Sequence, residues 1–252
     1  MNDGDILNVW GKGQLFCFSG IDGRTDFEEG LVLRSVDGMT AFEVKLPVAG
    51  GTVLLDDRPP AECCLAGDYF RLVTGQGRVV RGVMADAYHL LIDGECRVLG
   101  LADAVRIRQG RGRVLLGVRE KFCPELLDAD FETLFAARRR WLAGVTLPES
   151  LSELSRRTAA KACSMLKTQV CSPEGVLKHF WSTPDRWPHK QMWLWDSVFH
   201  ALGMRHCNPA LARDMISAMF DFQQENGFIP LCGNPHGVHR LTQPPVLALA
   251  MK

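Results

Sequence analysis

The stretch STPDRWPHKQMWLWDSVFHALGMRH, residues 182–206, carries the strongest structural and chemical signals in the chain. Trp187, Trp193 and Trp195 fall within nine positions, and Asp196 directly follows the last of them. Large flat rings beside a carboxylate suit sugar recognition, because the rings stack on C–H faces and the carboxylate accepts hydroxyl protons. The same rings could instead fill a hydrophobic core, so both interpretations stay open at this point.

The first part of this stretch cannot be helical, because Pro184 and Pro188 lack amide donors and push the preceding residues toward extended geometry. A helix is expected to begin near Met192. Its spacing then places four apolar side chains on one face in the pattern of a core stripe: Met192, Trp195, Phe199 and Leu202. On that spacing alone, packing is favoured over ligand contact for Trp195.

Asp196 lies in the first turn of the expected helix, where the helix dipole and free amides favour its ionised form. An anionic carboxylate accepts sugar hydroxyls well and is a poor general acid at neutral pH. His200, one turn along, and Trp193 are expected near its face, with Trp187 in the preceding loop. The alternative is that Asp196 only neutralises the helix start or pairs with Arg186.

Composition limits the function classes. The 252 residues include 29 basic and 29 acidic side chains, so the charge balance favours neither nucleic acid nor an anionic membrane. The arginines at 138–140 fit solvated helix faces. Nine cysteines without a framework indicate reduced thiols in a cytoplasmic protein. The sequence shows no signal peptide and no run of about 18 apolar residues, and no cofactor is expected.

Residues 1 to about 125 are expected to form short strands, which indicate an antiparallel β-sandwich. Turn signals such as DG and AGG divide the apolar runs, and Ile92–Glu95 is expected to form a two-residue hairpin. GQGRVVRG (75–82) and GRGRVLLG (110–117) are interpreted as turns that enter strands, because neither matches a phosphate loop or a dinucleotide fingerprint.

From about residue 128 the apolar period becomes helical, and no strand signal appears after about 120. A first helix is expected to place five side chains near one face, with alanines between them: Phe131, Leu134, Phe135, Arg138 and Leu142. A second is expected to begin with a capping box of Ser150 and Glu153 and to bury an apolar set: Leu154, Ala159, Ala162, Met165 and Leu166. A later helix is expected between Asn208 at the cap, with Pro209 in its first turn, and Gly227 just past its end.

Other candidate residues carry weaker signals. Cys232, His236 and His239 share a loop, but their spacing matches no standard zinc pattern, so no metal is expected. The acids of GIDGRTDFEEG, Asp22 and Asp26, are interpreted as turn and surface residues. Gln243 precedes two prolines at a helix start, where its amide could cap a helix or point into a pocket.

Three segments, MWLWDSVFHALGMRH, NGFIP and TQPPVLALA, resemble the front half of the (α/α)6-barrel glycosidases, near glycoside hydrolase family 63 and its mannosylglycerate-hydrolase and trehalase-like relatives. The resemblance covers about residues 181–252, and over 1–125 it is only architectural. It implies that Asp196 binds hydroxyls at the −1 subsite with Trp195 beside it. It also implies that Gln243 lines the same pocket and that residues 227–230 lie nearby.

The resemblance also implies an inverting enzyme whose general acid precedes Asn-Ser-Pro, and no DNSP occurs here. The catalytic acid and base are therefore expected beyond Lys252, and none is assigned. The expected organisation is a β-sandwich (1–125), a linker helix (126–148) and the first part of a barrel (149–252), truncated in this chain. The expected fold class is thus α+β, and the expected partner is a small carbohydrate.

Two alternatives to a glycosidase fragment remain at this stage. The chain could be a non-catalytic carbohydrate-binding or interaction protein that keeps the Trp/Asp pocket without the acid and base. It could also be a helical structural domain whose tryptophans all pack in the core, although Trp187 between two prolines has no helical face to serve.

Overall fold

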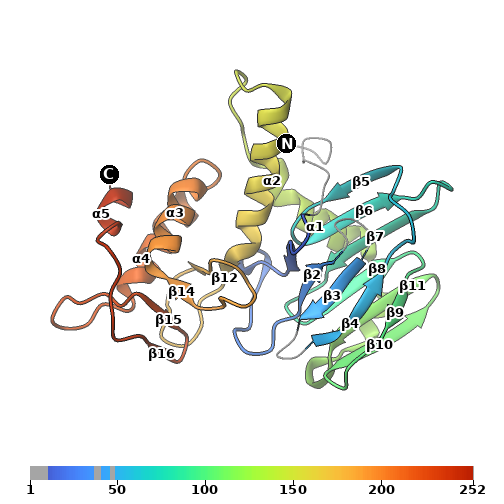
Figure 1. Cartoon of the computed structure of the whole chain (residues 1–252), viewed down its shortest axis with the longest axis horizontal. Coiled ribbons are helices and arrows are strands. Elements are labelled where there is room, and N and C mark those ends of the chain that lie inside the picture. The colour runs from blue at the N-terminus through green and yellow to red at the C-terminus, as the bar shows by residue number, and fades with distance from the viewer. Residues whose placement is uncertain (1–10, 37–40, 46–48, 252) are drawn as a thin grey trace. The chain divides into compact units, whose positions relative to one another are not determined.

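A computed structural model describes residues 11–36, 41–45 and 49–251 (Figure 1). The chain divides into two compact units, one of Met1–Phe18 with Glu28–Ser164 and the other of Ser19–Phe27 with Met165–Lys252. Antiparallel sheets build the first unit, and helices with short strands build the second. This order confirms the predicted α+β fold class, a β-sandwich followed by helices. The predicted boundaries at 125 and 148 remain predictions.

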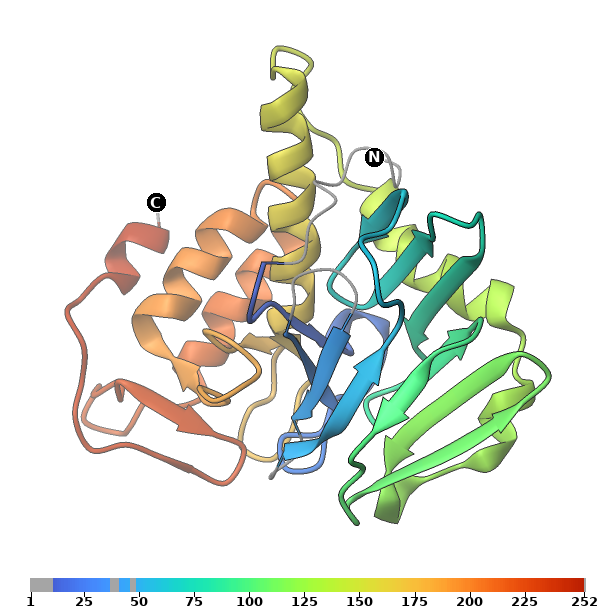
Figure 2. The same cartoon turned by 45° about the vertical axis from the view of Figure 1, so that its right-hand side comes forward.

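The first unit contains two antiparallel sheets. The six-stranded sheet has the order β10-β11-β8-β7-β6-β5. Its strands are β5 (Glu62–Leu65), β6 (Tyr69–Val73), β7 (Val79–Met84), β8 (His89–Asp93), β10 (Val105–Gly110) and β11 (Arg113–Val118). The five-stranded sheet has the order β1-β2-β3-β4-β9. Its strands are β1 (Leu15–Cys17), β2 (Val32–Ser35), β3 (Ala41–Lys45), β4 (Ala49–Leu54) and β9 (Arg97–Leu99). Figure 2 shows the blue strands and the teal-to-green strands of this unit from a second side.

Inward-facing side chains from both sheets share one apolar core. Phe16 and Phe42 of one sheet meet Phe70 of the other, with ring centroids 5.6 to 5.8 Å apart. Because side chains alternate along a strand, Tyr69 faces the opposite side from Phe70. The shared core between two antiparallel sheets confirms the predicted sandwich.

Helix α1 (Phe131–Ala143) covers the outer face of the six-stranded sheet. Two short 3₁₀ helices, η3 (Arg119–Lys121) and η4 (Pro124–Asp128), lead into it, and the Asp130 carboxylate caps it. The predicted apolar face is confirmed in Phe131 and Phe135, which are buried. Arg138, predicted to be solvated with its neighbours, is instead buried and donates to the Met84 and Ala85 carbonyls at 2.8 and 2.9 Å.

Residues 92–95 do not form the predicted hairpin. Strand β8 belongs to the six-stranded sheet, whereas β9 pairs with β4 in the other sheet, so this turn carries the chain between layers. Gly94 has φ +121°, a conformation that side chains disfavour, and its amide donates to the Gly112 carbonyl at 2.9 Å. The local motif predicted the turn correctly, but the pairing of the strand that follows depends on the packing of the two sheets.

The second unit contains α3 (Leu194–Met204), α4 (Pro209–Phe220), α5 (Leu247–Ala250) and the end of α2 (Glu153–Gln169). No strands were predicted in this unit, yet two small sheets form. One pairs β12 (Val170–Cys171) with β13 (Trp181–Ser182), and the other contains β14 (Met192–Trp193), β15 (Cys232–Asn234) and β16 (Gly237–Val238). Asn208 caps α4 and Pro209 opens it, as predicted. The helix ends at Phe220, well before Gly227, and Asp221 instead accepts from the Lys178 amide at 2.7 Å.

The segment Ser19–Phe27 is built into the second unit and includes the 3₁₀ helix η2 (Gly20–Asp22). The Lys167 ammonium lies 2.6 Å from the Asp22 carboxylate, with only 2 % and 10 % of the two side chains exposed. Thr25 and Ser172 each donate a backbone amide to the other's hydroxyl oxygen at 2.9 Å. The prediction that Asp22 is a surface acid is therefore wrong, because a lysine distant in sequence pairs with it.

Helix α2 also differs from its prediction. Leu154, expected to be buried, is 66 % exposed, while the buried positions are Ala160, Cys163, Ser164, Lys167, Thr168 and Gln169. The helix begins at Glu153, and the Ser152 hydroxyl, not that of Ser150, accepts from the Ser155 amide at 3.2 Å. The predicted apolar face was wrong because the helix buries polar side chains that find partners.

Two chain-wide features complete the description. None of the nine cysteines, all of which lie in the described ranges, forms a disulfide. Within the same ranges, every helix is too short or too polar to cross a lipid bilayer.

Candidate functional site

The candidate site is built around the first turn of α3, directly after strand β14. Trp193 ends β14, which pairs with β15, and it also occupies the N-cap position of α3 without a side-chain capping bond. The Gln243 carbonyl Oε1 instead accepts the Trp195 amide at 2.9 Å and satisfies one of the free amides of the helix start. Gln243 therefore acts as a cap, but for α3 and not for the helix that follows it in sequence.

The predicted core stripe on α3 is wrong. The helix begins at Leu194, and its buried residues are Leu194, Ser197, Val198, Ala201 and Met204. Trp195 is 46 % exposed and Phe199 is 54 % exposed, while Met192 is buried on the preceding strand. Because the helix starts after Met192, the spacing from that residue does not define its buried face. The Trp195 ring is therefore accessible to a ligand.

The Asp196 carboxylate is half-buried. Burial raises its pKa above the ordinary value, although its own backbone amide, a hydrogen bond with the Trp195 side chain and the charge of His189 oppose this. Asp185 adds to the increase by charge repulsion. The expectation that the helix start would lower this pKa is thus wrong in direction, because desolvation is the larger effect. Arg186, the alternative ion-pair partner, is buried and donates to the Thr168 carbonyl at 3.0 Å.

The loop before β14 presents a second carboxylate that sequence reasoning missed. The Asp185 carboxylate accepts a hydrogen bond from the His189 backbone amide at 2.8 Å, and it also lies 2.8 Å from the Nδ1 atom of the His189 ring. Trp187 lies half-buried between them in sequence. The four-residue spacing of Asp185 and His189 in a loop flanked by prolines was the available signal, because a carboxylate there can close a turn onto a later amide.

His200 and Trp193 present buried nitrogens near the same helix. His200 Nδ1 lies 3.1 Å from the Ser182 hydroxyl, and burial lowers the pKa of His200 to about 4, so its ring is neutral at pH 7. The Trp193 indole nitrogen is buried and has no hydrogen-bond partner among the described residues. Trp193 lies on β14, a strand that the sequence did not predict, whereas His200 lies on the predicted helix α3, and its contact with Ser182 depends on the fold.

Three cavities of the described chain lie away from Asp196. One of about 520 Å³ follows α3, α4 and α5, one of about 410 Å³ lies beside Asn208 and Asp214, and one of about 200 Å³ lies at one end of the sandwich. Asp196 lines none of these three cavities.

Cys232, His236 and His239 each contact a different partner. The Cys232 thiol donates to Gln191 Oε1 at 3.0 Å, and the His239 ring accepts the Leu241 amide at 3.2 Å. The His236 ring packs edge-on against Phe27 with centroids 6.1 Å apart. In the described part of the chain, no three His, Cys, Asp or Glu side chains are arranged to hold a metal.

Residues 189–252 match the family model of the mannosylglycerate hydrolase MGH1-like glycoside hydrolase domain. The match covers Asp196, Trp193, Trp195, His200 and Gln243, and begins two positions after Trp187. It confirms the resemblance to mannosylglycerate-hydrolase-like glycoside hydrolases over this segment. The chain is therefore a glycosidase-related protein.

Proposed function

We propose that this chain carries part of the −1 sugar subsite of an inverting glycoside hydrolase that acts on a small α-glucoside or α-mannoside such as mannosylglycerate. The observation that carries the proposal is the arrangement at the start of α3. A half-buried carboxylate, Asp196, lies next to an exposed indole, Trp195, whose backbone is fixed by Gln243. The match of residues 189–252 to a glycoside hydrolase domain supports it.

In this proposal, Asp196 accepts hydrogen bonds from sugar hydroxyls and Trp195 stacks on a C–H face of the sugar ring. Trp193, Trp187 and His200 line the same subsite, His200 as a neutral imidazole that can donate or accept. Gln243 fixes the position of Trp195, because its Oε1 accepts the Trp195 amide, and in this proposal its side-chain amide nitrogen donates to the ligand.

Asp196 serves binding and not proton transfer in this scheme. We propose that residues 149–252 form the first part of an (α/α)6 barrel and that the general acid and base lie in a segment beyond Lys252. The support is the absence of an Asp-Asn-Ser-Pro segment from the 252 residues. Reading the gene downstream of codon 252 tests this, because a continuing frame should encode DNSP and a later Glu. A stop codon there, with a folded sugar-binding product, would favour a non-catalytic binder.

The binding role is tested by titrating the chain with mannosylglycerate and with methyl α-glucoside, followed by NMR or calorimetry. Asp196→Asn keeps the size of the side chain and should weaken binding about tenfold or more, because hydrogen bonds to a charged group contribute about 1.5–3 kcal/mol. Phe199→Ala is the matched control, since Phe199 is an exposed aromatic on the same helix. Equal affinities for wild type, Asp196→Asn and Trp195→Ala would overturn the proposal.

A further inference from the structure

The smallest of the three cavities described above lies on the β-sandwich, in the unit that does not contain α3. It has a volume of about 200 Å³ and is lined by eight residues from three chain segments: Leu54–Asp57, Arg78 and Glu95–Arg97. The segments are held together by the sandwich, because Leu54 at the end of β4 pairs in register with Arg97 at the start of β9. Arg78 directly precedes β7. Leu54 and Arg97 are thus held by strand pairing, and the other six lining residues lie in the connections directly next to strands.

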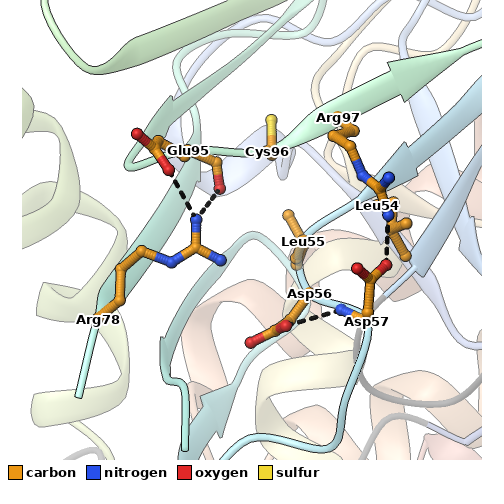
Figure 3. Close-up of a pocket in the computed structure, with 8 residues that line it drawn as sticks. All are labelled: Leu54, Leu55, Asp56, Asp57, Arg78, Glu95, Cys96 and Arg97. Atoms are coloured by element: carbon orange, nitrogen blue, oxygen red, sulfur yellow. Dashed lines mark hydrogen bonds and ion pairs between the residues drawn. The ribbon is translucent and has the colours of Figure 1, made fainter. Parts of the chain in front are cut away.

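The charged side chains of this cavity form hydrogen bonds with one another, and some of the Arg78 donors remain available for a ligand. Arg78 donates to the Glu95 carboxylate at 3.2 Å and to its backbone carbonyl at 3.4 Å, both through Nη1. Its Nη2 and Nε make no hydrogen bond to a described residue. Arg97 donates to Asp57, and the Asp57 amide donates to Asp56 Oδ1 at 2.7 Å. Figure 3 shows Arg78 with Glu95 on one side, Arg97 with Asp57 on the other, and Leu55 between them.

The floor of the cavity is apolar. Leu55 is buried in the sandwich core, and Cys96 packs against that core. Burial raises the pKa of the Cys96 thiol to about 11, although the charge of Arg78 opposes this, so the sulfur is a neutral thiol at pH 7. Thiolate chemistry at this position is therefore disfavoured.

The lining selects among ligand classes. Three carboxylates and two guanidiniums leave one net negative charge, which disfavours an anion such as phosphate. The described residues contain no group of three ligands placed for a metal ion. No aromatic ring lines the cavity, and its volume is below the roughly 300–1,000 Å³ of sites for drug-sized ligands. A hydroxyl group, in contrast, can donate to a carboxylate and accept from a guanidinium at the same time.

We infer that this cavity binds a small neutral polyhydroxyl compound, a single sugar ring or a short polyol. Hydroxyls of the ligand bond to the remaining Arg78 donors and to the carboxylates of Asp56 and Asp57, and its C–H face rests on Leu55 and Cys96. The ion pairs stay intact when such a ligand binds, because a neutral ligand does not compete for either charge. The site is separate from the subsite proposed at Asp196.

The test is an amide NMR titration of the chain carrying Asp196→Ala, with mannose, sorbitol and sodium phosphate as separate probes. Mannose or sorbitol should shift the amides of residues 54–57 and 95–97 in a saturable way. The Arg78→Gln variant should weaken this binding at least tenfold. Arg108→Gln, at an exposed arginine on β10, is the matched control and should leave it unchanged.

A thiol measurement gives an independent readout. Mannose should slow alkylation of Cys96, measured by peptide mass spectrometry, and should leave the exposed Cys123 unaffected. Three results would overturn the inference: no saturable shift at these amides, shifts with phosphate alone, or equal affinity in Arg78→Gln and wild type. Because Asp196 is absent from the titrated protein, failure here leaves the α3 subsite untouched, and the converse also holds.

Discussion

The interior of the sandwich and the interior of the helical unit are built from different chemistry. The sandwich core consists of apolar side chains from two sheets, with Phe16, Phe42 and Phe70 at its centre. The helical unit has an apolar core too, around Trp181 and Val198, but it also buries the ion pair of Lys167 and Asp22. It meanwhile exposes Trp195 and Phe199.

This difference shows how far hydrophobic pattern predicts burial. Short apolar runs predicted the strands of the sandwich, and their side chains alternate between the core shared by the two sheets and the opposite face, which α1 covers on the six-stranded sheet. Helices have several possible faces, and a polar face can be buried when partners satisfy it. Four substitutions or conditions test the contrast.

The largest expected effect is on the buried ion pair. Lys167→Ala should reduce the free energy of unfolding by about 3–5 kcal/mol, because Asp22 is left as an uncompensated buried charge. Urea denaturation measures this. The control is Lys121→Ala in the sandwich unit, where an exposed pair with Glu29 at 3.1 Å should contribute about 0–1 kcal/mol. Equal losses in the free energy of unfolding of the two variants would contradict the proposed contrast between the units.

The next effect concerns pH. The pKa of His200 is lowered to about 4, so the unfolded chain binds a proton at higher pH than the folded chain. Stability from this group is therefore fully present above about pH 6.5 and is lost as pH falls toward 4, by about 3 kcal/mol in total. Unfolding curves of wild type and His200→Gln between pH 7 and 4 give the difference. His206→Gln, at an exposed histidine, should retain the wild-type slope.

A smaller effect is expected from tight packing in the sandwich. A Cβ added at Gly82 would lie 2.2 Å from Phe70 Cε1, so Gly82→Ala should cost about 1–3 kcal/mol by overpacking. Thermal unfolding is a suitable measurement. At Gly75 an added Cβ meets nothing within 4 Å, so Gly75→Ala should change stability little. A neutral Gly82→Ala would show that the core adapts more readily than its apolar packing suggests.

The smallest stability effect is expected on the exposed face of α3. Trp195→Ala and Phe199→Ala should each change the free energy of unfolding by about 0.5 kcal/mol or less, as surface substitutions do. Trp181→Ala, at a tryptophan 1 % exposed, should cost about 3–5 kcal/mol. Only Trp195→Ala should also weaken sugar binding. A large loss of stability in Trp195→Ala would restore the core interpretation of this ring.

The sequence predicted much of the fold through local signals. The short apolar strands, the Asp-Gly turn at 93–94, the α1 face and the Asn208–Pro209 helix start all depend on neighbours in the chain. The candidate residues around Trp193 and Asp196 were also visible, since they share one short segment. Asp185 was missed because its contact with His189 requires a loop conformation that the prolines permit but do not specify.

By itself, the sequence determined the order of a β-sandwich and a helical unit, and the tryptophan–aspartate segment that matches a glycoside hydrolase domain. These follow from periodicity and from residues a few positions apart. Only the tertiary structure decided that β9 joins the second sheet, that Asp22 pairs with Lys167, and that Gln243 caps α3. Such contacts join residues 40 or more positions apart, and their energies depend on desolvation and packing that no local pattern records.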